Sequence, residues 1–385
     1  MKNFDAIIVG GGLIGSAIAF ELAGEKLRVA LIDRQQPGRE ASWAAAGMLS
    51  PGPDSPEAMP LVPLGKESLQ LYSEFIAGVE EASGMTVNFA REGTFEIFAG
   101  PQSESARDAM VEQYRRLELA VETISPEAAR KVEPSLGAAA EAIAWLPEEA
   151  TVDPRLLTQA VLTGAERRGA ETREGRAVDS LLCRGGACTG VVVGGEKIEA
   201  AHVVIAAGSF CGTISDCSSG MAGKLARYAP VRPVRGQMIA LQSESVKLKK
   251  VLRSQRGYLV PRNDGRIIAG STLEDAGFVK QVTPEGIRRI LDGAVELAPA
   301  LAEATIVEQW AGLRPDTPDH LPIIGPTEMK GLMMATGHYR NGILLAPATA
   351  KIVRDWIVNG KAEFSAENFS PLRFTVARSH ARTSG

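Results

Sequence analysis

The sequence predicts an α/β protein with two domains. One domain is built around a parallel sheet from separated segments, and the other is α+β with a mostly antiparallel sheet. Three observations predict this fold. The chain of 385 residues is too long for one compact core. Its start reads as strand, glycine turn, helix and strand, and a second buried strand of the same kind ends near residue 205. The region from Arg232 to Gln309 carries several alternating strands.

The first predicted unit is a strand followed by a glycine turn and a helix. Ala6–Val9 is a short apolar run, typical of a strand buried on both faces. Gly10, Gly12 and Gly15 follow in GxGxxG spacing. The first glycine permits a tight turn, the second lets the backbone approach a pyrophosphate, and the third allows close packing of helix on strand. Good helix formers run from Leu13 to Ala23, so free N–H groups at that helix start can face phosphates.

A second predicted strand, Arg28–Ile32, ends in an acid, Asp33. At this place a carboxylate accepts hydrogen bonds from ribose hydroxyls, and it disfavours the 2′-phosphate of NADP. Strand, helix, second strand and acid all fall at the spacing of a Rossmann-like dinucleotide site, which we favour over a structural turn. The pattern leaves open whether the dinucleotide is a nicotinamide cofactor or a flavin.

Composition limits the classes of function. Hydrophobic residues make up 45% of the chain and charged residues 23%, and the net charge is −4. These values are ordinary for a globular protein and give no reason to expect a nucleic-acid partner. No apolar run approaches the length of a membrane span, and the first strand starts too close to Met1 to leave room for a signal peptide. We expect a cytoplasmic protein without a membrane partner. Its four cysteines lack CxxC spacing, so no metal site is expected.

The middle of the chain alternates between helical and extended patterns. Ser50–Pro63 is dense in proline and is predicted as loop or extended chain. Leu64–Ser83 has apolar residues at helical spacing, whereas Gly93–Gly100 alternates like a strand. Further helices are expected at 104–119 and 154–168, and strands with glycine turns at 177–193.

A second buried strand carries small residues at its carboxyl end. Val203–Ile205 is apolar and is followed by Ala206, Ala207 and Gly208. Small residues at the end of a parallel strand let a cofactor lie close to the backbone, although ordinary core packing is the alternative. Together with the glycine turn, this strand predicts a cofactor domain assembled from separated pieces.

The region 232–309 predicts the substrate-facing sheet. Its segments GQMIAL, GYLVPR and RIIAGS alternate as strands. A helix is expected at Thr283–Leu297, with Thr283 as its N-cap and Pro284 in its first turn.

The C-terminal part decides between the two cofactors. Leu332–Ala335 is a predicted strand, 336–342 a loop, and a helix then runs through Trp356. Asn341 and Gly342, just ahead of this helix, leave backbone N–H groups unpaired at the positive end of the helix dipole. A flavin whose pyrimidine edge lay there would have the negative charge of its reduced form stabilised. A nicotinamide enzyme has no use for such a helix, so the pattern favours a flavin.

These motifs resemble the glycine oxidases of the D-amino-acid oxidase and sarcosine oxidase superfamily. The resemblance runs essentially end to end and is densest at VGGGLIGSAIA, AAAGML, HVVIAAG, GYLVPR, AGLRP and GHYRNGILLAPAT. It implies an FAD-binding domain of segments 1–88, 145–222 and 312–372, a substrate domain of segments 89–144 and 223–311, and a disordered tail at 373–385. It also implies FAD held without a covalent bond, because covalent members use a cysteine near the flavin and this chain has none after Cys217.

The resemblance further implies which residues hold FAD. They lie in the glycine turn, after the second strand, in the AAAGM loop, in the middle region and in the C-terminal loop. Asp33 stands where many relatives have glutamate, and the shorter acid should still reach the ribose. The predicted cofactor residues are Gly10, Gly12, Leu13, Ile14, Gly15, Asp33, Arg34, Ala41, Ser42, Ala46, Gly47, Met48, Val178, Ala207, Gly208, His338, Tyr339, Arg340, Asn341, Gly342, Ile343 and Leu344.

Three residues are predicted to act on the substrate. Arg314, in AGLRP, would bind the substrate carboxylate through two parallel N–H donors, the alternative being a surface ion pair. Tyr258 would donate its hydroxyl to the same carboxylate, unless it is only a core aromatic. Arg340 matches a second substrate-contacting position, or else only braces the flavin. Leu273 is expected on the pocket wall and Arg256 at its mouth, where a relative has histidine.

The implied activity is FAD-dependent oxidative deamination of glycine and other small amines, including sarcosine and small D-amino acids. No general base is evident, which agrees with transfer of the Cα hydrogen as hydride to flavin N5. The products would be the imine, then glyoxylate and ammonia, with hydrogen peroxide if O₂ is the acceptor. In the family the imine feeds thiamine synthesis, and members are often tetrameric, so a homo-oligomer is expected.

Three alternatives stay open at this point. A D-amino-acid or secondary-amine dehydrogenase would keep the fold and pass electrons to a quinone or a carrier protein. A non-catalytic flavoprotein would act as a binding or sensing module. An NAD-dependent dehydrogenase is disfavoured, because it leaves HVVIAAG and the C-terminal helix without a purpose.

Overall fold

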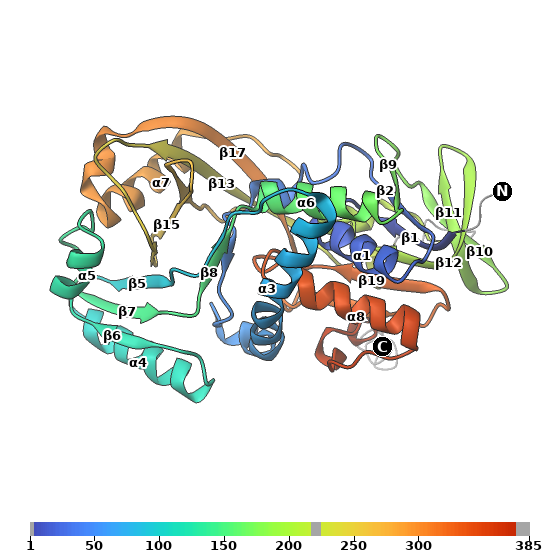
Figure 1. Cartoon of the computed structure of the whole chain (residues 1–385), viewed down its shortest axis with the longest axis horizontal. Helices are drawn as coiled ribbons and strands as arrows, with labels where there is room; N and C mark the ends of the chain where they lie inside the picture. The colour runs from blue at the N-terminus through green and yellow to red at the C-terminus, as the bar shows by residue number, and fades with distance from the viewer. Residues whose placement is uncertain (1–3, 217–224, 375–385) are drawn as a thin grey trace, which may run out of the picture.

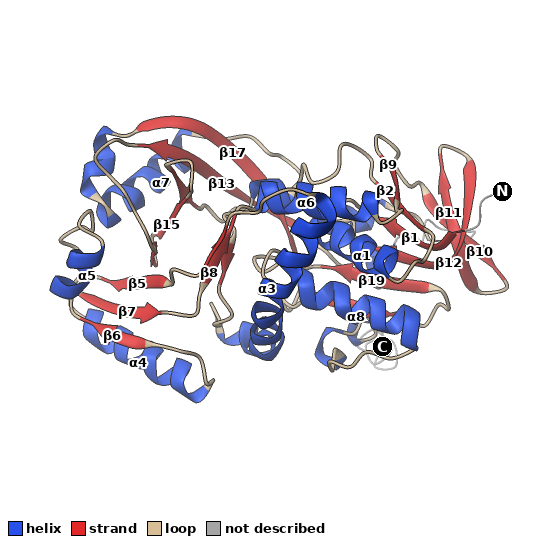
Figure 2. Ribbon diagram, viewed as in Figure 1, coloured by secondary structure: helices blue, strands red, loops and turns tan. Residues whose placement is uncertain are grey.

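Two eight-stranded sheets organise the chain, one toward each end of an elongated molecule (Figures 1 and 2). The computed structural model describes residues 4–216 and 225–374. The predicted α/β class, with a partly parallel sheet and a second, largely antiparallel one, is confirmed. Within the described ranges, no helix is both long and apolar enough to span a membrane.

The first sheet has a parallel centre. Strand β1 pairs in parallel with β2 on one side and with β12 on the other, and β12 pairs in parallel with β19. Val9, the last residue of β1, lies opposite both Ile32 and Ile205. The carboxyl ends of three strands therefore meet at one edge, which is where such sheets bind ligands. The strands of this sheet are β1 (Phe4–Val9), β2 (Val29–Ile32), β9 (Glu171–Arg173), β10 (Ser180–Arg184), β11 (Ala187–Val193), β12 (Glu196–Ile205), β18 (Ile323–Pro326) and β19 (Leu332–Thr336).

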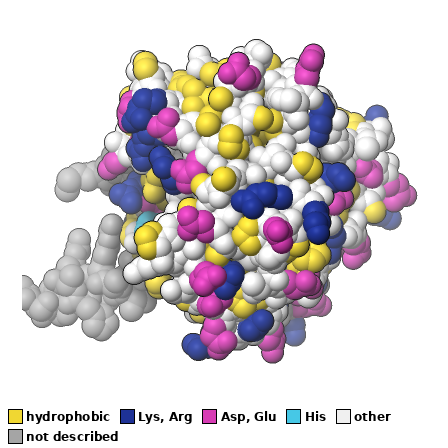
Figure 3. All heavy atoms as spheres, turned by 90° about the vertical axis from the view of Figure 1, so that its left-hand side faces the viewer, with side chains coloured by type: hydrophobic (Ala, Val, Ile, Leu, Met, Phe, Trp, Pro, Cys, Tyr) yellow, Lys and Arg dark blue, Asp and Glu magenta, His cyan; other side chains and the backbone are white. Residues whose placement is uncertain are grey.

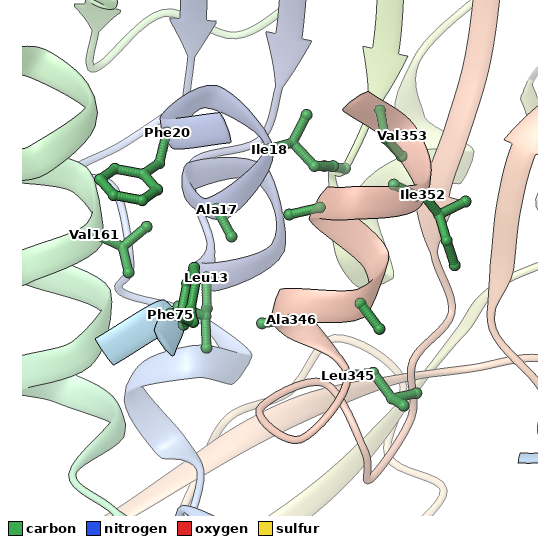
Figure 4. Close-up of a cluster of buried hydrophobic side chains, with 14 of the residues drawn as sticks. Leu13, Ala17, Ile18, Phe20, Phe75, Val161, Leu345, Ala346, Ile352 and Val353 are labelled. Carbon is green, nitrogen blue, oxygen red and sulfur yellow. The ribbon is translucent and has the colours of Figure 1, made fainter. Parts of the chain in front are cut away.

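Helix α1, which follows the glycine turn, is buried between other helices (Figure 4). Its Phe20 side chain points toward Val161 of α6, and its Ile18 side chain points toward Ile352 of α8. Burying one such side chain fully stabilises a fold by about 1.5–3 kcal/mol, so this cluster holds α1 firmly against the sheet. The helices here are α1 (Leu13–Gly24), α3 (Val62–Ser83), α6 (Pro154–Arg167) and α8 (Ala346–Asn359).

The second sheet is antiparallel apart from one parallel pair, β14 with β5. Its longest strands, β13 and β17, pair along their whole length, with Gly236 opposite Gly312. Helix α7 covers one face of this sheet, and α4 lies against β5 and β7. The elements are β5 (Thr94–Phe98), α4 (Ser103–Arg116), β6 (Glu122–Ile124), α5 (Pro126–Val132), β7 (Ala142–Leu146), β13 (Arg232–Gln242), β14 (Val251–Ser254), β15 (Gly257–Pro261), β16 (Arg266–Gly270), α7 (Pro284–Leu297) and β17 (Thr305–Asp316).

The remaining elements are short. A third sheet has the order β3–β8–β4, and five segments of the described ranges form 3₁₀ helices. The short elements are α2 (Ala41–Ala44), β3 (Met48–Leu49), η1 (Pro56–Leu61), β4 (Phe89–Ala90), β8 (Ala150–Val152), η2 (Gly208–Thr213), η3 (Leu225–Arg227), η4 (Pro299–Glu303) and η5 (Glu367–Phe369).

Helix α7 agrees with its sequence signals, whereas the proline-dense segment does not. Thr283 caps α7 as predicted, since its Oγ1 accepts the Gly286 N–H at 3.1 Å. Ser50–Pro63, predicted as loop, instead contains η1 and the start of α3. Pro56 and Pro63 stand in the first turns of these helices, where a missing N–H costs nothing. The prolines mark helix starts here.

The predicted domain limits stay a prediction, but two strands bear on them. Strand β7 crosses the limit placed between residues 144 and 145, and β17 crosses the one placed between 311 and 312. Most of the predicted tail, from residue 375 on, lies outside the described residues. Within the described part of this segment, Arg373 pairs with Asp319 at 2.7 Å.

Charge on the molecular surface is mixed. On the face at the end that carries the second sheet, Lys and Arg side chains lie among Asp and Glu side chains and do not merge into one basic patch (Figure 3). A nucleic-acid footprint would need basic side chains gathered on one face.

Candidate cofactor and substrate site

A large cavity extends from the carboxyl edge of the first sheet to the second sheet. Its empty volume, including the open mouth, is about 1680 Å³. Residues at the ends of β1, β2 and β12 line one part, and residues of β13, β15 and β17 line another.

The glycine turn after β1 leaves no space for side chains. Gly10 has φ +108°, and a Cβ there would overlap the Ala206 carbonyl of the neighbouring strand. A Cβ at Gly15 would overlap the Gly10 carbonyl oxygen, as expected for close packing of helix on strand. Gly12 lines the cavity as the N-cap of α1, and Ser42 Oγ accepts the Leu13 N–H at 2.9 Å.

The acid after β2 is held by backbone amides. The Asp33 carboxylate accepts the Gly11 N–H at 2.7 Å and the Gln35 N–H at 2.9 Å. Burial raises the pKa of Asp33, although these two hydrogen bonds act in the opposite direction. Beside it, the Arg34 guanidinium lies 3.5 Å from the centre of the Phe210 ring, and Arg34, like Asp33, lines the cavity.

Side chains of helix α3 donate hydrogen bonds to carbonyl groups of the C-terminal loop. Tyr72 Oη donates to the Ile343 carbonyl at 2.5 Å, and Ser68 Oγ donates to the Leu344 carbonyl at 2.6 Å. Within the described ranges, the amides of Gly342, Ile343 and Leu344 have no protein acceptor. Gly342 and Ile343 line the cavity. The N–H groups of these two lining residues are thus available to an acceptor on a ligand.

The free amides lie one turn earlier than the helix that was expected to supply them. Helix α8 begins at Ala346, not directly after Gly342. The preceding residues form a turn in which the Leu345 N–H donates to the Asn341 carbonyl at 2.9 Å. The amides upstream of that bond therefore stay unpaired, although they are not part of α8.

His338 is buried and neutral. Its Nε2 lies 3.0 Å from Thr349 Oγ1, and burial lowers the pKa of His338 to about 3. It lines the cavity but is ill suited to act as a base near neutral pH, because its free imidazole binds protons too weakly. The next residue, Tyr339, has φ +47° and stacks on His320 with 5.4 Å between ring centres.

Arg314 projects from β17 into the cavity wall. Its Nη2 donates to Ser271 Oγ at 2.7 Å and its Nη1 donates to the Thr272 carbonyl at 3.2 Å. Among the described residues, no carboxylate pairs with it, and burial lowers its pKa. A half-buried guanidinium with only neutral partners lacks the counter-charge that such a group normally needs.

Tyr258 and Arg340 also reach the cavity. Tyr258 Oη donates to Met238 Sδ at 3.9 Å, and the Tyr258 ring lies against Gly270, where a Cβ would overlap it. Arg340 Nη1 lies 2.6 Å from Asp54 Oδ2, in a partly exposed ion pair. Arg340 thus has a counter-charge of its own, whereas Arg314 has none.

Most predicted site residues line this cavity, and five do not. Gly15 packs behind the turn, and Asn341 and Leu344 face a smaller pocket beside residues 50–54. Arg256, predicted at the mouth, pairs with Glu296 of α7 at 2.6 Å. Leu273, predicted on the wall, is 60% exposed, because β16 ends at Gly270 and strand alternation no longer sets its direction.

Sequence reasoning missed a group of lining residues from the second sheet and from η2. Ser271, which holds Arg314, follows a strand and belongs to no motif. The glycines opposite each other on β13 and β17 were the available signal, because glycine inside paired strands often marks a close approach. The missed residues discussed here are Phe210, Gly236, Met238, Ser271 and Gly312.

Comparison with known proteins gives consistent results. Residues 5–356 match the FAD dependent oxidoreductase family. The chain is 33% identical to the glycine oxidase of Pseudomonas aeruginosa, over 91% of this chain and 93% of that protein. It is 36% identical to the bifunctional protein ThiO/ThiG of Trichormus variabilis, over 96% of this chain but 55% of that protein, so it spans about half the length of that relative. The crystal structure of glycine oxidase from Geobacillus kaustophilus matches with a TM-score of 0.88 and 29% identity, over 96% of this chain and 98% of that one.

Proposed function

The chain belongs to the family of FAD-dependent oxidoreductases, and from this premise we propose that it oxidises glycine and other small amines, including sarcosine and small D-amino acids. The observation that carries the proposal is Arg314, a half-buried guanidinium that lines the cavity and whose hydrogen-bond partners among the described residues are neutral oxygens. A small zwitterion would supply the missing carboxylate, and it has no large side chain that the cavity would need to accommodate. The relatives named glycine oxidase support the same substrate class.

The geometry fits FAD along the cavity. The turn at Gly10 and Gly12 offers backbone space for a pyrophosphate, and Asp33 lies where a ribose hydroxyl donates. The free amides of Gly342 and Ile343 would face the pyrimidine edge of the flavin. We propose that FAD is held without a covalent bond. FAD, when bound, supplies the two-electron acceptor for the reaction.

The protein would orient the substrate and supply no base. Arg314 binds the carboxylate, and Tyr258 adds a hydroxyl beside it. The acids that line the cavity among the described residues are Asp33 and Glu40, and both lie at the end near Arg34. His338 stays neutral and is bonded to Thr349. These residues leave hydride transfer from Cα of the neutral amine as the proposed step, with position supplied by the carboxylate contacts.

The test starts from the purified, flavin-loaded protein. Adding glycine without oxygen should bleach the flavin, and adding it in air should release hydrogen peroxide. Arg314→Ala should weaken glycine binding by orders of magnitude while the flavin content stays unchanged. Arg256→Ala is the matched control, since this arginine lies outside the cavity. A panel of small amines that leaves the flavin oxidised would reject the proposal.

Oxygen as the acceptor needs its own measurement. The reduced enzyme, mixed rapidly with air-saturated buffer, should reoxidise fast enough to sustain the steady-state rate. Slow reoxidation by air together with fast reoxidation by a quinone would make the protein a dehydrogenase instead.

A further inference from the structure

Arg314 takes its position from residues that follow β16. Ser271 and Thr272 supply both of its protein acceptors, and both acceptors are neutral. On its other side the guanidinium lies against Gly236 of β13, where a Cβ would overlap it. The guanidinium is therefore held by geometry and not by a counter-charge. Whatever fixes residues 271–272 also fixes Arg314.

Residues 271–274 are held from β13. The Gln237 N–H donates to Thr272 Oγ1 at 2.9 Å, and the Thr272 N–H donates back to the Gln237 carbonyl at 3.4 Å. Two residues later, Glu274 and Arg235 exchange backbone hydrogen bonds of 2.9 and 3.0 Å. The segment therefore follows β13 after β16 has ended.

The side chain of Gln237 completes this attachment. Gln237 is fully buried, and its Nε2 donates to Glu274 Oε1 at 2.7 Å and to Thr283 Oγ1 at 3.1 Å. Its Oε1 accepts the Thr283 N–H at 2.7 Å. A carboxylate opposite Nε2 and an N–H opposite Oε1 define which way the amide points.

Two further groups hold the amide in place. The Glu274 carboxylate also accepts from Arg235 Nε at 3.0 Å, so its charge is balanced. Gly286, in the first turn of α7, lies flat against the Gln237 amide, where a Cβ would overlap both Nε2 and Oε1. Gln237 is thus enclosed between α7 and the segment that holds Arg314.

Strand alternation separates Gln237 from the cavity. Its neighbours Gly236 and Met238 both line the cavity, so the side chain between them points to the opposite face of the sheet. Gln237 does not line the cavity itself. Any effect of this side chain on the substrate must therefore pass through residues 271–272 and Arg314.

We propose that Gln237 is a positioning residue for the substrate carboxylate: its side chain holds Glu274, its backbone holds Thr272, and through residues 271–274 it sets the position of Arg314. The proposal rests on the proposed function, because it assumes that Arg314 binds a carboxylate. A displacement of about 1 Å at a reacting centre can lower a rate roughly a hundredfold, so a fully buried anchor matters even at a distance.

The test compares acetate with acetamide as ligands of the flavin-loaded enzyme, because only acetate carries the carboxylate. Binding is measured from the change in the flavin absorbance spectrum. Gln237→Met removes the amide at similar length and should raise the acetate Kd by about tenfold or more, with the acetamide Kd unchanged. The KM for glycine should rise likewise, and the flavin content should stay constant. Gln242→Met, at the exposed end of the same strand, is the control and should change none of these values.

An exchanged pair tests the same contact in a second way. Gln237→Glu alone places two carboxylates side by side and should weaken acetate binding. Adding Glu274→Gln restores one amide and one carboxylate, and most of the acetate affinity should return. This pair keeps the test decisive if Gln237→Met does not fold.

The outcomes separate the two proposals. If Gln237→Met leaves the acetate Kd unchanged, or weakens acetate and acetamide equally, Gln237 does not position the carboxylate. If the unmodified enzyme does not bind acetate, or if Arg314→Ala binds it equally well, the proposed function fails first.

Discussion

The two ends of the cavity are built in different ways. At the dinucleotide end, backbone and small residues do the work: Gly10 and Gly12 leave space, and the amides of Gly342 and Ile343 stay free. At the substrate end, the key group is the long Arg314 side chain, and partners from three strands and their connections hold it. An added Cβ at Gly10 or Gly15 would overlap backbone atoms, whereas the substrate end depends on a chain of contacts that can fail gradually.

The largest effect is expected from a substitution in the glycine turn. Gly15→Ala should yield a protein without flavin and with a lowered Tm, because the new Cβ overlaps the Gly10 carbonyl and the backbone must shift. Reconstitution with added FAD, followed by fluorescence, measures the loss. Gly78→Ala on α3 is the control, since its Cβ meets nothing within 4 Å. It should raise stability by up to about 1 kcal/mol. Normal FAD uptake by Gly15→Ala would contradict this account of the turn.

At the substrate end, a glycine-to-alanine change should weaken substrate binding without affecting flavin binding. Gly236→Ala pushes the Arg314 guanidinium off β13, so the KM for glycine should rise roughly tenfold to a hundredfold. Flavin content should stay normal, because this strand face lies far along the chain from the glycine turn. Steady-state kinetics with an absorbance measurement of bound flavin checks both. Loss of flavin in this variant would mean that the ends are not independent.

A smaller effect is expected at Arg340. Asp54→Asn removes its counter-charge, and a partly exposed pair is worth about 1 kcal/mol at most. A dicarboxylate such as malonate should then bind up to about fivefold more tightly, with acetate nearly unchanged. Titrations at low and high salt provide the check, because added salt should reduce the gain. An equal gain for both ligands would show that Asp54 does not act through Arg340.

The smallest expected effect concerns Asp33 in the protein without FAD. Burial raises the pKa of this carboxyl in the folded state, so its ionisation opposes folding. The free energy of unfolding is therefore highest below the ordinary Asp pKa of about 4, where the carboxyl is protonated. It falls as the pH rises through the raised pKa. Asp33→Asn should therefore melt higher than the parent at pH 7, and the difference should shrink toward pH 4. Tm values of the two apoproteins across this range decide, and a constant difference would contradict the expectation.

The same contrast explains what the sequence could predict. The glycine turn and the acid after β2 are local patterns, so they were placed to the residue, and the α7 cap was equally readable from Thr283 and Pro284. The substrate side depends on which segment follows which strand. Leu273 was placed on the wall by alternation, but β16 had already ended at Gly270.

Arg256 shows a second limit of prediction from sequence. It lies close in sequence to Tyr258, yet the tight turn between β14 and β15 directs it toward Glu296 on α7. Ser271 and Gln237 lie in the predicted strands RIIAGS and GQMIAL, but no pattern singled them out, because their roles arise from contacts between strands far apart in the chain. Periodicity predicts elements, but it does not predict what a residue beyond a strand end will touch.

The parallel pairing of β12 with β19 has a consequence for biosynthesis. Ala207 and Gly208, at the end of β12, emerge from the ribosome long before Leu332 opens β19, and the turn at Gly342 comes later still. A nascent chain that already displays its first dinucleotide motif thus lacks the last wall of the pocket. Loading with the vitamin-derived ligand, as proposed above, must wait until translation has passed this turn, and products truncated before it should be pale and short-lived.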